Sequence, residues 1–227
     1  MSVTIGTSTT YHSDATYQAA HTFAHNNNKE VVVIGFCVSA WENVARTISS
    51  VTYGGVACVE IGYLMFYQDG DERYYVGAYK CMAPPSGANN VVITANAAVS
   101  CSGGAISLGG VGAIGAGATA TGGGGGHTVT VNVPSAVGDT VIDIAALRAN
   151  NNQWQAWTIG ASQVSIWTDL HSDGADGRAD QETSSSYEVA TGATTTMSWT
   201  EGAGTMEMGT VAFAATPTKG GNVMWWF

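Results

Sequence analysis

A pair of adjacent glycines, Gly54-Gly55, is the sequence feature that most constrains what this chain can fold into. Apolar and polar residues alternate before it in residues 48–53 and after it in residues 59–63. Such alternation is typical of β-strands with one buried face. Two glycines accept the positive φ angles of a two-residue hairpin turn at no steric cost. The stretch therefore predicts an antiparallel β-hairpin.

The same pattern of short alternating runs and Gly-, Asn- and Ser-rich turns recurs along the chain. Two runs are apolar on both faces, residues 31–38 and residues 140–147, and each predicts a central strand covered on both sides. Residues 127–133 alternate strictly, with the valines on the buried face. About a dozen short strands with frequent turns predict an all-β fold, a jelly-roll-like antiparallel β-sandwich. We expect its core to contain Val33, Ile34, Phe36, Val51, Tyr53, Ile142, Ile144, Met197, Trp199 and Phe213.

Length and composition set the domain organisation. The chain has 227 residues, of which 45% are hydrophobic and 11% charged, so it can bury a substantial core. We expect residues 1–216 to form a single sandwich domain. Residues 217–221 then form a short linker to an apolar C-terminal tail that ends at residue 227.

The charge balance excludes several classes of partner. Seven Lys and Arg oppose seventeen Asp and Glu, which gives a formal net charge of -10. This charge repels phosphate backbones and offers no basic cluster for anionic lipids. The longest apolar run, residues 31–41, is too short to span a membrane as a helix. No secretory signal precedes it, so we expect synthesis in a cytoplasm, no membrane insertion and no nucleic-acid binding.

Glycine also dominates residues 109–126, which we interpret as a long surface loop. Within it, residues 110–115 match the glycine fingerprint of dinucleotide-binding proteins. That fingerprint needs a helix directly after it to hold the pyrophosphate. The Gly- and Ala-rich residues that follow are not expected to form a stable helix, so we do not expect nucleotide binding. A second loop is expected at residues 84–90, where two prolines occur.

Four carboxylates, Asp169, Asp173, Asp176 and Asp180, lie close together with two glycines between them. Calcium prefers several oxygen ligands on a sharply bending chain, so this segment is a weak candidate for a structural calcium site. Its spacing differs from that of the helical calcium loop, and a solvated acidic loop is the simpler interpretation. We expect no cofactor other than such an ion.

Two histidines, His21 and His25, are the one pair with spacing suited to a metal. On a strand they share a face but lie ~13 Å apart, too far to share an ion. We therefore expect structural or surface roles for them. No Gly-x-Ser-x-Gly elbow and no distinctive carboxylate pair is present, so an enzyme is not expected.

The tryptophans Trp154 and Trp157 follow an Asn-rich segment and suggest two alternatives. Exposed flat aromatic rings stack on sugars, which makes both residues candidates for glycan contact. Large aromatic side chains also fill sandwich cores and subunit contacts. The four cysteines, at positions 37, 58, 81 and 101, have no Cys-x-x-Cys spacing. We interpret them chiefly as small buried side chains, with a disulfide or a zinc site as the alternatives.

Several short sequence segments, in a fixed order across residues 20–215, together resemble a known group of domains. They are Val51–Gly55, Tyr79–Gly87, Asn90–Thr94, Ala105–Val111, Val137–Ile144, Thr195–Thr200 and Gly209–Phe213. This order resembles a group of jelly-roll-like β-sandwich domains found in phage virion structural proteins and in secreted bacterial surface proteins. The shared residues belong to turns and core, so the resemblance implies a fold and no catalytic residues.

The resemblance leaves two functions to weigh. An acidic domain without a secretion signal suits a virion protein, made in the host cytoplasm and placed on the particle surface as capsid decoration or as a tail or fibre component. Its partners would be other virion subunits, with self-association. The alternative is a lectin-like module of a surface protein or adhesin that binds cell-surface glycans.

The C-terminal tail is the candidate assembly element. Its residues are Val223, Met224, Trp225, Trp226 and Phe227. Exposed aromatic side chains of this size are unfavourable in water, so we expect the tail to dock. It docks either on its own domain or on a neighbouring subunit, where aromatic anchors usually dominate the interface energy.

Overall fold

The computed structural model describes residues 2–13, 17–42, 44–123, 128–148, 157–169, 181–202 and 207–219. In these ranges the chain is all-β, with seventeen antiparallel strands arranged in sheets. The predicted all-β, sandwich-like fold is confirmed. The strands are more numerous than the dozen expected, and not all are short, because β8 (Gly87–Gly109) is 23 residues long.

The strands fall into two consecutive sets. The first half of the chain forms β1 (Thr4–His12), β2 (Gln18–Asn27), β3 (Val31–Trp41), β4 (Ile48–Tyr53), β5 (Val56–Ala57), β6 (Val59–Asp69), β7 (Glu72–Met82) and β8. The second half forms β9 (Val111–Ile114), β10 (Ala118–Gly123), β11 (Thr128–Pro134), β12 (Thr140–Arg148), β13 (Trp157–Ile159), β14 (Val164–Asp169), β15 (Gln181–Val189), β16 (Thr194–Glu201) and β17 (Glu207–Pro217).

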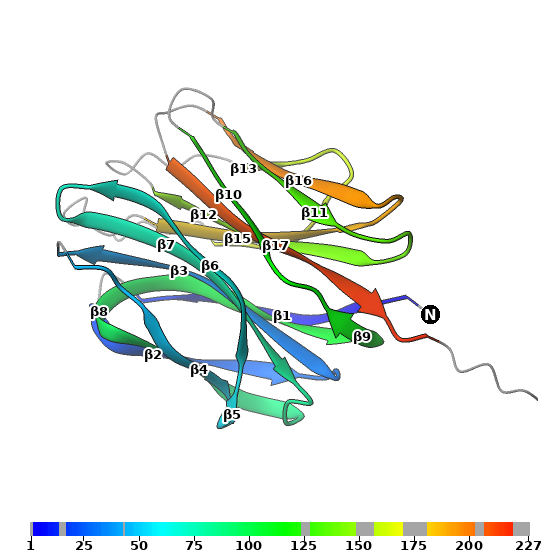
Figure 1. Cartoon of the computed structure of the whole chain (residues 1–227). Coiled ribbons are helices and arrows are strands. Elements are labelled where there is room, and N and C mark those ends of the chain that lie inside the picture. The colour runs from blue at the N-terminus through cyan, green and yellow to red at the C-terminus, as the bar shows by residue number, and fades with distance from the viewer. Residues whose placement is uncertain are drawn as a thin grey trace, which may run out of the picture.

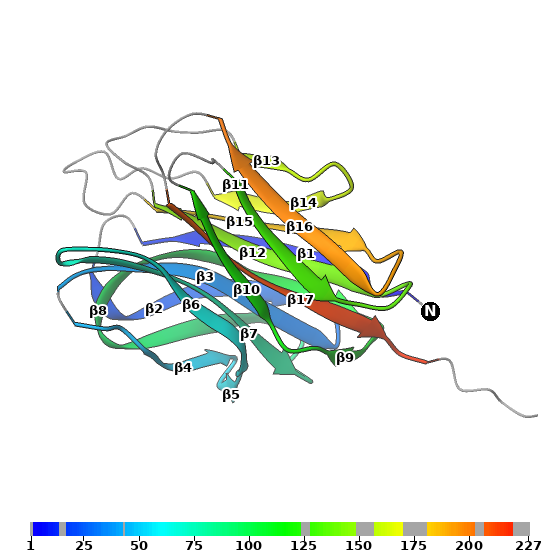
Figure 2. The same cartoon turned by 45° about the horizontal axis from the view of Figure 1, so that its top comes forward.

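Each half folds into two facing layers, so the molecule has four (Figures 1 and 2). In the first half, β8 is shared: up to Val99 it pairs with β2 and β4, and from Ser100 it pairs with β3 and then β1. This gives a first outer sheet, β2-β8-β4-β5, and a first inner sheet, β1-β8-β3-β7-β6. The second inner sheet is β10-β17-β12-β15-β14, with β9 beside β17, and the second outer sheet is β11-β16-β13.

Separate apolar cores fill the spaces between these layers. Ile34 and Phe36 of the first inner sheet pack with Tyr53 of the first outer sheet. The two inner sheets share the largest core, which includes Val33 and Phe213. Smaller clusters join the second inner and outer sheets. All ten residues expected in the core are buried.

The two runs that are apolar on both faces occupy the centres of the inner sheets, as predicted. Strand β3 lies between β8 and β7, and β12 lies between β17 and β15. Every residue from Val31 to Ala40 is buried, since this strand is covered by one core on each face.

The two halves have the same topology. Strands that hold the same place in the corresponding sheets of the two halves also follow each other in the same order along the chain. The equivalent strands are β1 and β10, β2 and β11, β3 and β12, β4 and β13, β6 and β14, and β7 and β15, while β8 is equivalent to β16 and β17 together. The register matches as well. Val33 lies opposite Lys80 and Ile106, while Ile142 lies opposite Tyr187 and Phe213 at the corresponding positions.

A shared irregularity supports this equivalence. The β6–β7 ladder shifts register between Glu60 and Gly62, and the β14–β15 ladder shifts between Ser165 and Trp167. The two shifts occupy equivalent positions of the equivalent strands β6 and β14. Because bulges are specific local features of a sheet, their coincidence argues that the halves are two versions of one sandwich.

The two versions face each other through their inner sheets. Strand β3 packs on β15 as its counterpart β12 packs on β7, and β1 packs on β14 as β10 packs on β6. The equivalent residues Gly35 and Ile144 also meet, since a Cβ on Gly35 would lie 2.4 Å from Ile144 Cδ1. Reciprocal contacts of this kind define an isologous, two-fold interface. The chain is thus organised like a dimer within one polypeptide.

The Gly54-Gly55 turn forms as predicted, with φ values of 55° and 81°. Its hairpin is short, because only Thr52–Ala57 and Tyr53–Val56 pair across it. After Cys58 the chain joins the first inner sheet, where β6 pairs with β7. The alternation in residues 59–63 therefore belongs to a different layer from the hairpin.

The interpretation of residues 109–126 as a surface loop is wrong for the part that the structure describes. Residues 111–114 and 118–123 form β9 and β10, both paired with β17. Glycine serves close packing here: a Cβ on Gly117 would lie 2.7 Å from Ile61 O, and one on Gly122 would lie 2.3 Å from Thr128 O. The loop expected at residues 84–90 is also shorter, because β8 begins at Gly87 and pairs there with Asn27.

Candidate functional site

The polar strand β15 is the centre of the most distinctive chemistry in the molecule. Its residues 181–186, Gln-Glu-Thr-Ser-Ser-Ser, are all fully buried. In the first half, the matching strand β7 places Tyr74 and Tyr79 at the corresponding ends of this segment. A buried polar side chain is stable only when it is hydrogen-bonded, so the surroundings of β15 must supply partners on both faces.

On the face toward the second outer sheet, that partner is Asp143 of β12. Its Oδ1 accepts hydrogen bonds from the Ser186 amide at 2.9 Å and the Ser186 hydroxyl at 2.8 Å. Its Oδ2 accepts from Trp199 Nε1 at 2.7 Å and Gln163 Nε2 at 3.3 Å. Complete burial nevertheless raises the pKa of Asp143 to about 7. The carboxyl group fastens the second outer sheet to the inner one.

Trp157 belongs to the same interlayer region. Its indole N–H donates to the buried carboxylate of Glu182, and its ring meets Trp199 edge to face at a centroid distance of 5.2 Å. The ring is half-buried and packs against the cluster formed by Leu147 and Met208. Of the two alternatives for this residue, the described contacts match the core-filling one.

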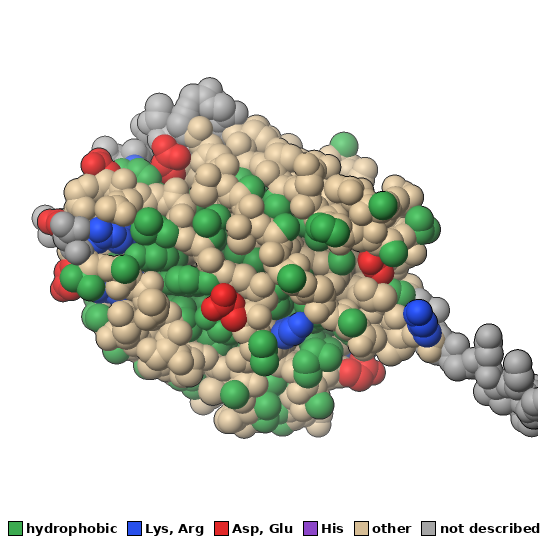
Figure 3. All heavy atoms as spheres, viewed as in Figure 1, with side chains coloured by type: hydrophobic (Ala, Val, Ile, Leu, Met, Phe, Trp, Pro, Cys, Tyr) green, Lys and Arg blue, Asp and Glu red, His purple; other side chains and the backbone are tan. Residues whose placement is uncertain are grey.

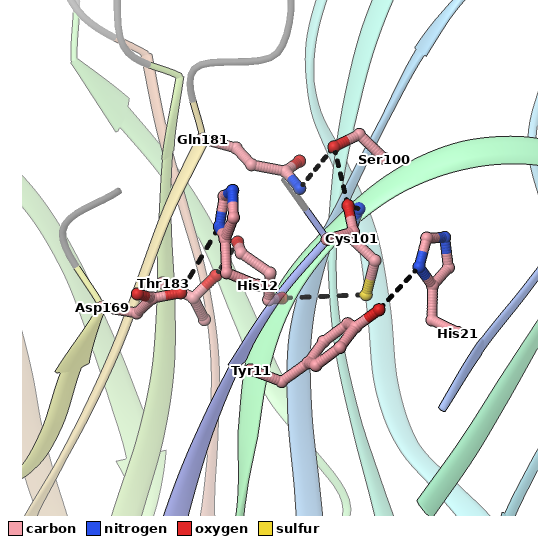
Figure 4. A network of polar contacts seen from close by, with 10 residues as sticks. Tyr11, His12, His21, Ser100, Cys101, Asp169, Gln181 and Thr183 are labelled. Atoms are coloured by element: carbon pink, nitrogen blue, oxygen red, sulfur yellow. Dashed lines mark hydrogen bonds and ion pairs between the residues drawn. The ribbon is translucent and has the colours of Figure 1, made fainter. Parts of the chain in front are cut away.

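The other face of β15 forms a polar seam between the two halves (Figure 4). The Ser102 and Thr183 hydroxyls lie 2.6 Å apart, and Gln181 Nε2 donates to Ser100 Oγ at 3.4 Å. Ser13 Oγ lies 3.2 Å from Ser100 Oγ and accepts the Cys101 amide at 3.0 Å. Ser13 and the hydroxyl and amide groups of β8 and β15 thus hydrogen-bond to one another inside the molecule.

His12 and Asp169 lie at the edge of this seam, with His12 Nδ1 3.7 Å from Asp169 Oδ2. Ser102 is the cross-strand neighbour of His12, so serine, histidine and aspartate meet here. A nucleophilic serine must be reached by its substrate, which a side chain with no exposed surface prevents. The Ser102 hydroxyl also has Thr183 as a close partner. The geometry therefore supports a structural seam.

A second polar contact joins the halves nearby. Arg148 of β12 donates two hydrogen bonds to Glu72 of β7, from Nε at 3.0 Å and from Nη2 at 2.8 Å. Its guanidinium also lies 4.1 Å from the centre of the Tyr67 ring. Both charged side chains are largely buried, so this bidentate pair orients the inner sheets relative to each other.

The two histidines predicted to be structural are both buried on β2. His25 Nδ1 lies 3.0 Å from Thr9 Oγ1 and its Nε2 lies 2.9 Å from Ser107 Oγ, while His21 Nε2 lies 2.9 Å from Val99 O. Burial lowers the pKa of both, to about 4 for His25. Of the two expected roles, structural and surface, these contacts match the structural one.

Several candidate residues fall outside the described part of the chain: Trp154, Asp173, Asp176, Asp180, Val223, Met224, Trp225, Trp226 and Phe227. Asp169 is the one residue of the acidic candidate set that is placed, at the end of β14. In the described ranges, no group of three or more His, Cys, Asp or Glu side chains is arranged to hold a metal ion. No helix among those residues is long and apolar enough to cross a membrane.

The pairing of β15 with β12 and β14 places the described residues that border two of the candidate segments. Arg148 pairs with Gln181, and Asp169 pairs with Thr183. Arg148, Asp169 and Gln181, which border the segments 149–156 and 170–180, therefore lie at the same end of the second inner sheet. Sequence reasoning overlooked β15 and the seam beneath this end, because an all-polar segment carries no hydrophobic signal.

Comparison with known protein families, with curated proteins and with solved structures found no match to this chain.

Proposed function

We propose that the protein is a phage virion structural protein at the particle surface, either a capsid decoration or a tail or fibre component, which acts by binding and assembly. The observation that carries this proposal is the reciprocal docking of two equivalent sandwiches. A rigid body built this way presents two matching sets of strand ends to its neighbours. Loops on a rigid scaffold are the common means by which proteins bind partners.

Rigidity follows from the contacts between the halves. The apolar core between the inner sheets is continuous, and the Arg148–Glu72 pair and the Ser102–Thr183 contact add directional bonds to it. Side chains on the face in Figure 3 include few charged groups, scattered among apolar and uncharged polar ones. Such a surface suits contacts that depend on shape and burial more than on ion pairing.

The base of the C-terminal tail supports the assembly part of the proposal. Pro217 pairs with Val111 at the end of β17, and the Thr218 amide donates to Gly110 O at 2.8 Å. Lys219, the last described residue, is exposed. The described part of the chain thus ends at the surface, next to a hydrogen-bonded position. In the proposed assembly, residues 222–227, which include three aromatic side chains, serve as an anchor on a neighbouring subunit.

Purified particles provide the test. Mass spectrometry of particles should find the protein at high copy number, and soluble protein added to particles that lack it should bind. A variant with Trp225, Trp226 and Phe227 changed to serine keeps the chain length and should retain its melting temperature while losing particle binding. Absence of the protein from purified particles would overturn the proposal. A large fall in melting temperature of the monomeric variant would instead show that the tail docks on its own domain.

Binding to a glycan array distinguishes the lectin-like alternative from the virion function. Trp157→Ala is a poor probe because its ring packs against Trp199, so loss of binding would follow from loss of stability. Trp154→Ala is the sharper variant. Glycan binding by the full chain that this substitution removes, together with absence from particles, would favour the alternative.

A further inference from the structure

Cys58 and Cys81 occupy opposed positions where β6 meets β7. Val59 pairs with Lys80 in this antiparallel ladder, so the next opposed positions along the same register are 58 and 81. Directly opposed residues of antiparallel strands have Cα atoms about 4.5–5.5 Å apart. Disulfides bridge Cα separations of about 4.4–6.8 Å. Continuation of this register by one residue gives the two cysteines a Cα separation that a disulfide accepts.

Side chains at directly opposed positions of an antiparallel pair project from the same face of the sheet. The Cys58 thiol donates to Val56 O at 3.9 Å, and the Cys58 and Cys81 thiols are near enough for each to affect the pKa of the other. Cys81 is buried in the core between the first outer and inner sheets, and Cys58 packs against the same cluster from its edge. Cys58 keeps part of its surface exposed, so a reagent in solution reaches it first.

The other two cysteines have a different arrangement. Cys37 and Cys101 are completely buried on the neighbouring strands β3 and β8, but Cys37 belongs to the core between the inner sheets and Cys101 to the core of the first half. Their side chains project from opposite faces of one sheet, which prevents a bond between them without rearrangement of the backbone. They serve as internal controls for reactivity.

We propose that Cys58 and Cys81 are a latent disulfide site, oxidised by thiol–disulfide exchange with a small disulfide such as oxidised glutathione. Cys58 loses its proton and attacks one sulfur of the glutathione disulfide, which releases one glutathione thiolate and leaves a mixed disulfide on Cys58. Cys81 then loses its proton and attacks the Cys58 sulfur, which releases the second glutathione. Two protein thiols are oxidised to one disulfide, and one glutathione disulfide is reduced to two glutathiones that take up the two protons.

The environment of the pair determines how it behaves. Burial raises the pKa of both the Cys58 and the Cys81 thiol above the usual value. Exchange proceeds through the thiolate, so oxidation is slow at neutral pH and accelerates as the pH rises. A reducing compartment keeps the pair as thiols, and an oxidising one converts it to a bond that staples β6 to β7. The site thus suits a single locking step after release into an oxidising medium, independent of the proposed virion role.

Oxidation of the full, folded chain tests this site. The protein is incubated with oxidised glutathione at mildly alkaline pH, and the remaining thiols are alkylated before intact-mass analysis and peptide mapping. Free thiols should fall from the four of the reduced chain to two, with a peptide that contains position 58 joined to one that contains position 81. The oxidised protein should also melt at a higher temperature, because the bond restricts the unfolded chain.

Two variants complete the design. Cys58→Ala changes a partly exposed side chain, so it should fold normally and keep three free thiols under the same treatment, with no rise in melting temperature. Cys101→Ala leaves the pair intact and should still form the bond. Persistence of all four thiols, a stable mixed disulfide on Cys58, or a bond that involves Cys37 or Cys101 would each overturn the proposal.

Discussion

Gly35 and Ile144 hold equivalent positions in the two halves of the chain and lie against each other at the centre of the molecule. Gly35 sits in β3 opposite Ala78, and Ile144 sits in β12 opposite Ser185, at the same points of matching ladders. The glycine leaves the space that the isoleucine fills. Two strands with the same place in the topology have thus become complementary in shape where they meet.

This contact predicts a marked loss of stability on Gly35→Ala. The added Cβ would lie within 2.8 Å of three Ile144 carbon atoms, in a strand whose neighbours prevent movement. Overpacking of this kind costs about 1–3 kcal/mol. Urea denaturation should show the loss, and the double variant Gly35→Ala/Ile144→Ala should cost less than the sum of the two single changes. Additive effects would mean that the two positions do not meet.

Asp143 predicts a pH-dependent stability. Its pKa is raised by burial to about 7 in the folded chain, from 3.8 in the unfolded one. The folded state therefore binds the proton more tightly, so the stabilisation is fully present below the unfolded pKa and is lost as the pH rises through about 7. The buried histidines act in the opposite sense, because their pKa values fall from 6.5 on folding, to about 4 for His25, and their contribution to stability therefore grows as the pH rises toward 6.5.

Denaturation midpoints measured on both sides of the Asp143 pKa provide the check. The amide of Asp143→Asn does not titrate, so the stability of the wild-type chain relative to this variant should fall as the pH rises from 3.8 to about 7, while the histidine contribution cancels in the comparison. The groups that face Asp143, namely Ser186, Gln163 and Trp199, are uncharged and stay unchanged over the window. An equal pH dependence in both proteins would contradict the assignment to Asp143.

We expect substitution of a glycine in β10 to cost more stability than substitution of a glycine in an open turn. Gly122→Ala would place a Cβ 2.3 Å from Thr128 O, and backbone must move to relieve it. We expect a loss of about 1–3 kcal/mol. Gly192→Ala is the matched control, since a Cβ there meets nothing within 4 Å. Thermal melting of both variants should separate them, and equal melting temperatures would restore the view of this segment as a loop.

We expect the stability of the folded chain to depend strongly on the pairing of Arg148 with Glu72. Arg148→Met leaves a largely buried carboxylate without its guanidinium, for which the usual cost is about 3–5 kcal/mol. Arg148→Lys keeps the charge but loses the two parallel hydrogen bonds, and it should cost less. Arg148→Met combined with Glu72→Gln should recover part of the stability in chemical denaturation. If Arg148→Met alone is neutral, the pair does not hold the halves together.

The pattern of hydrophobic residues in the sequence was enough to predict the central strands. Residues 31–38 and 140–147 are apolar on both faces, and a strand of that kind is stable only between two covered surfaces. The Gly54-Gly55 turn was equally readable, because it depends on the local backbone alone. The core residues followed from the same periodicity.

The polar strand β15 and the glycine-rich strands β9 and β10 could not be read in this way. Residues 181–186 are buried because Asp143, Ser100 and Ser102 supply hydrogen-bond partners from strands far away in the sequence. Gly122 is in a strand because it pairs with Met208 of β17, and glycine is required there because the backbone of Thr128 approaches closely. Neither cause is visible in a local window of residues.

The duplication shows most clearly what sequence and tertiary structure each decided. The sequence by itself determined an all-β chain with two fully buried central strands, since hydrophobic period and turn chemistry act over a few residues. Only the tertiary structure decided that its halves are two versions of one sandwich docked face to face. Matching positions hold residues as different as Ile34 and Asp143, or Gly35 and Ile144, because register and hydrogen bonding between strands preserve a topology without preserving side chains.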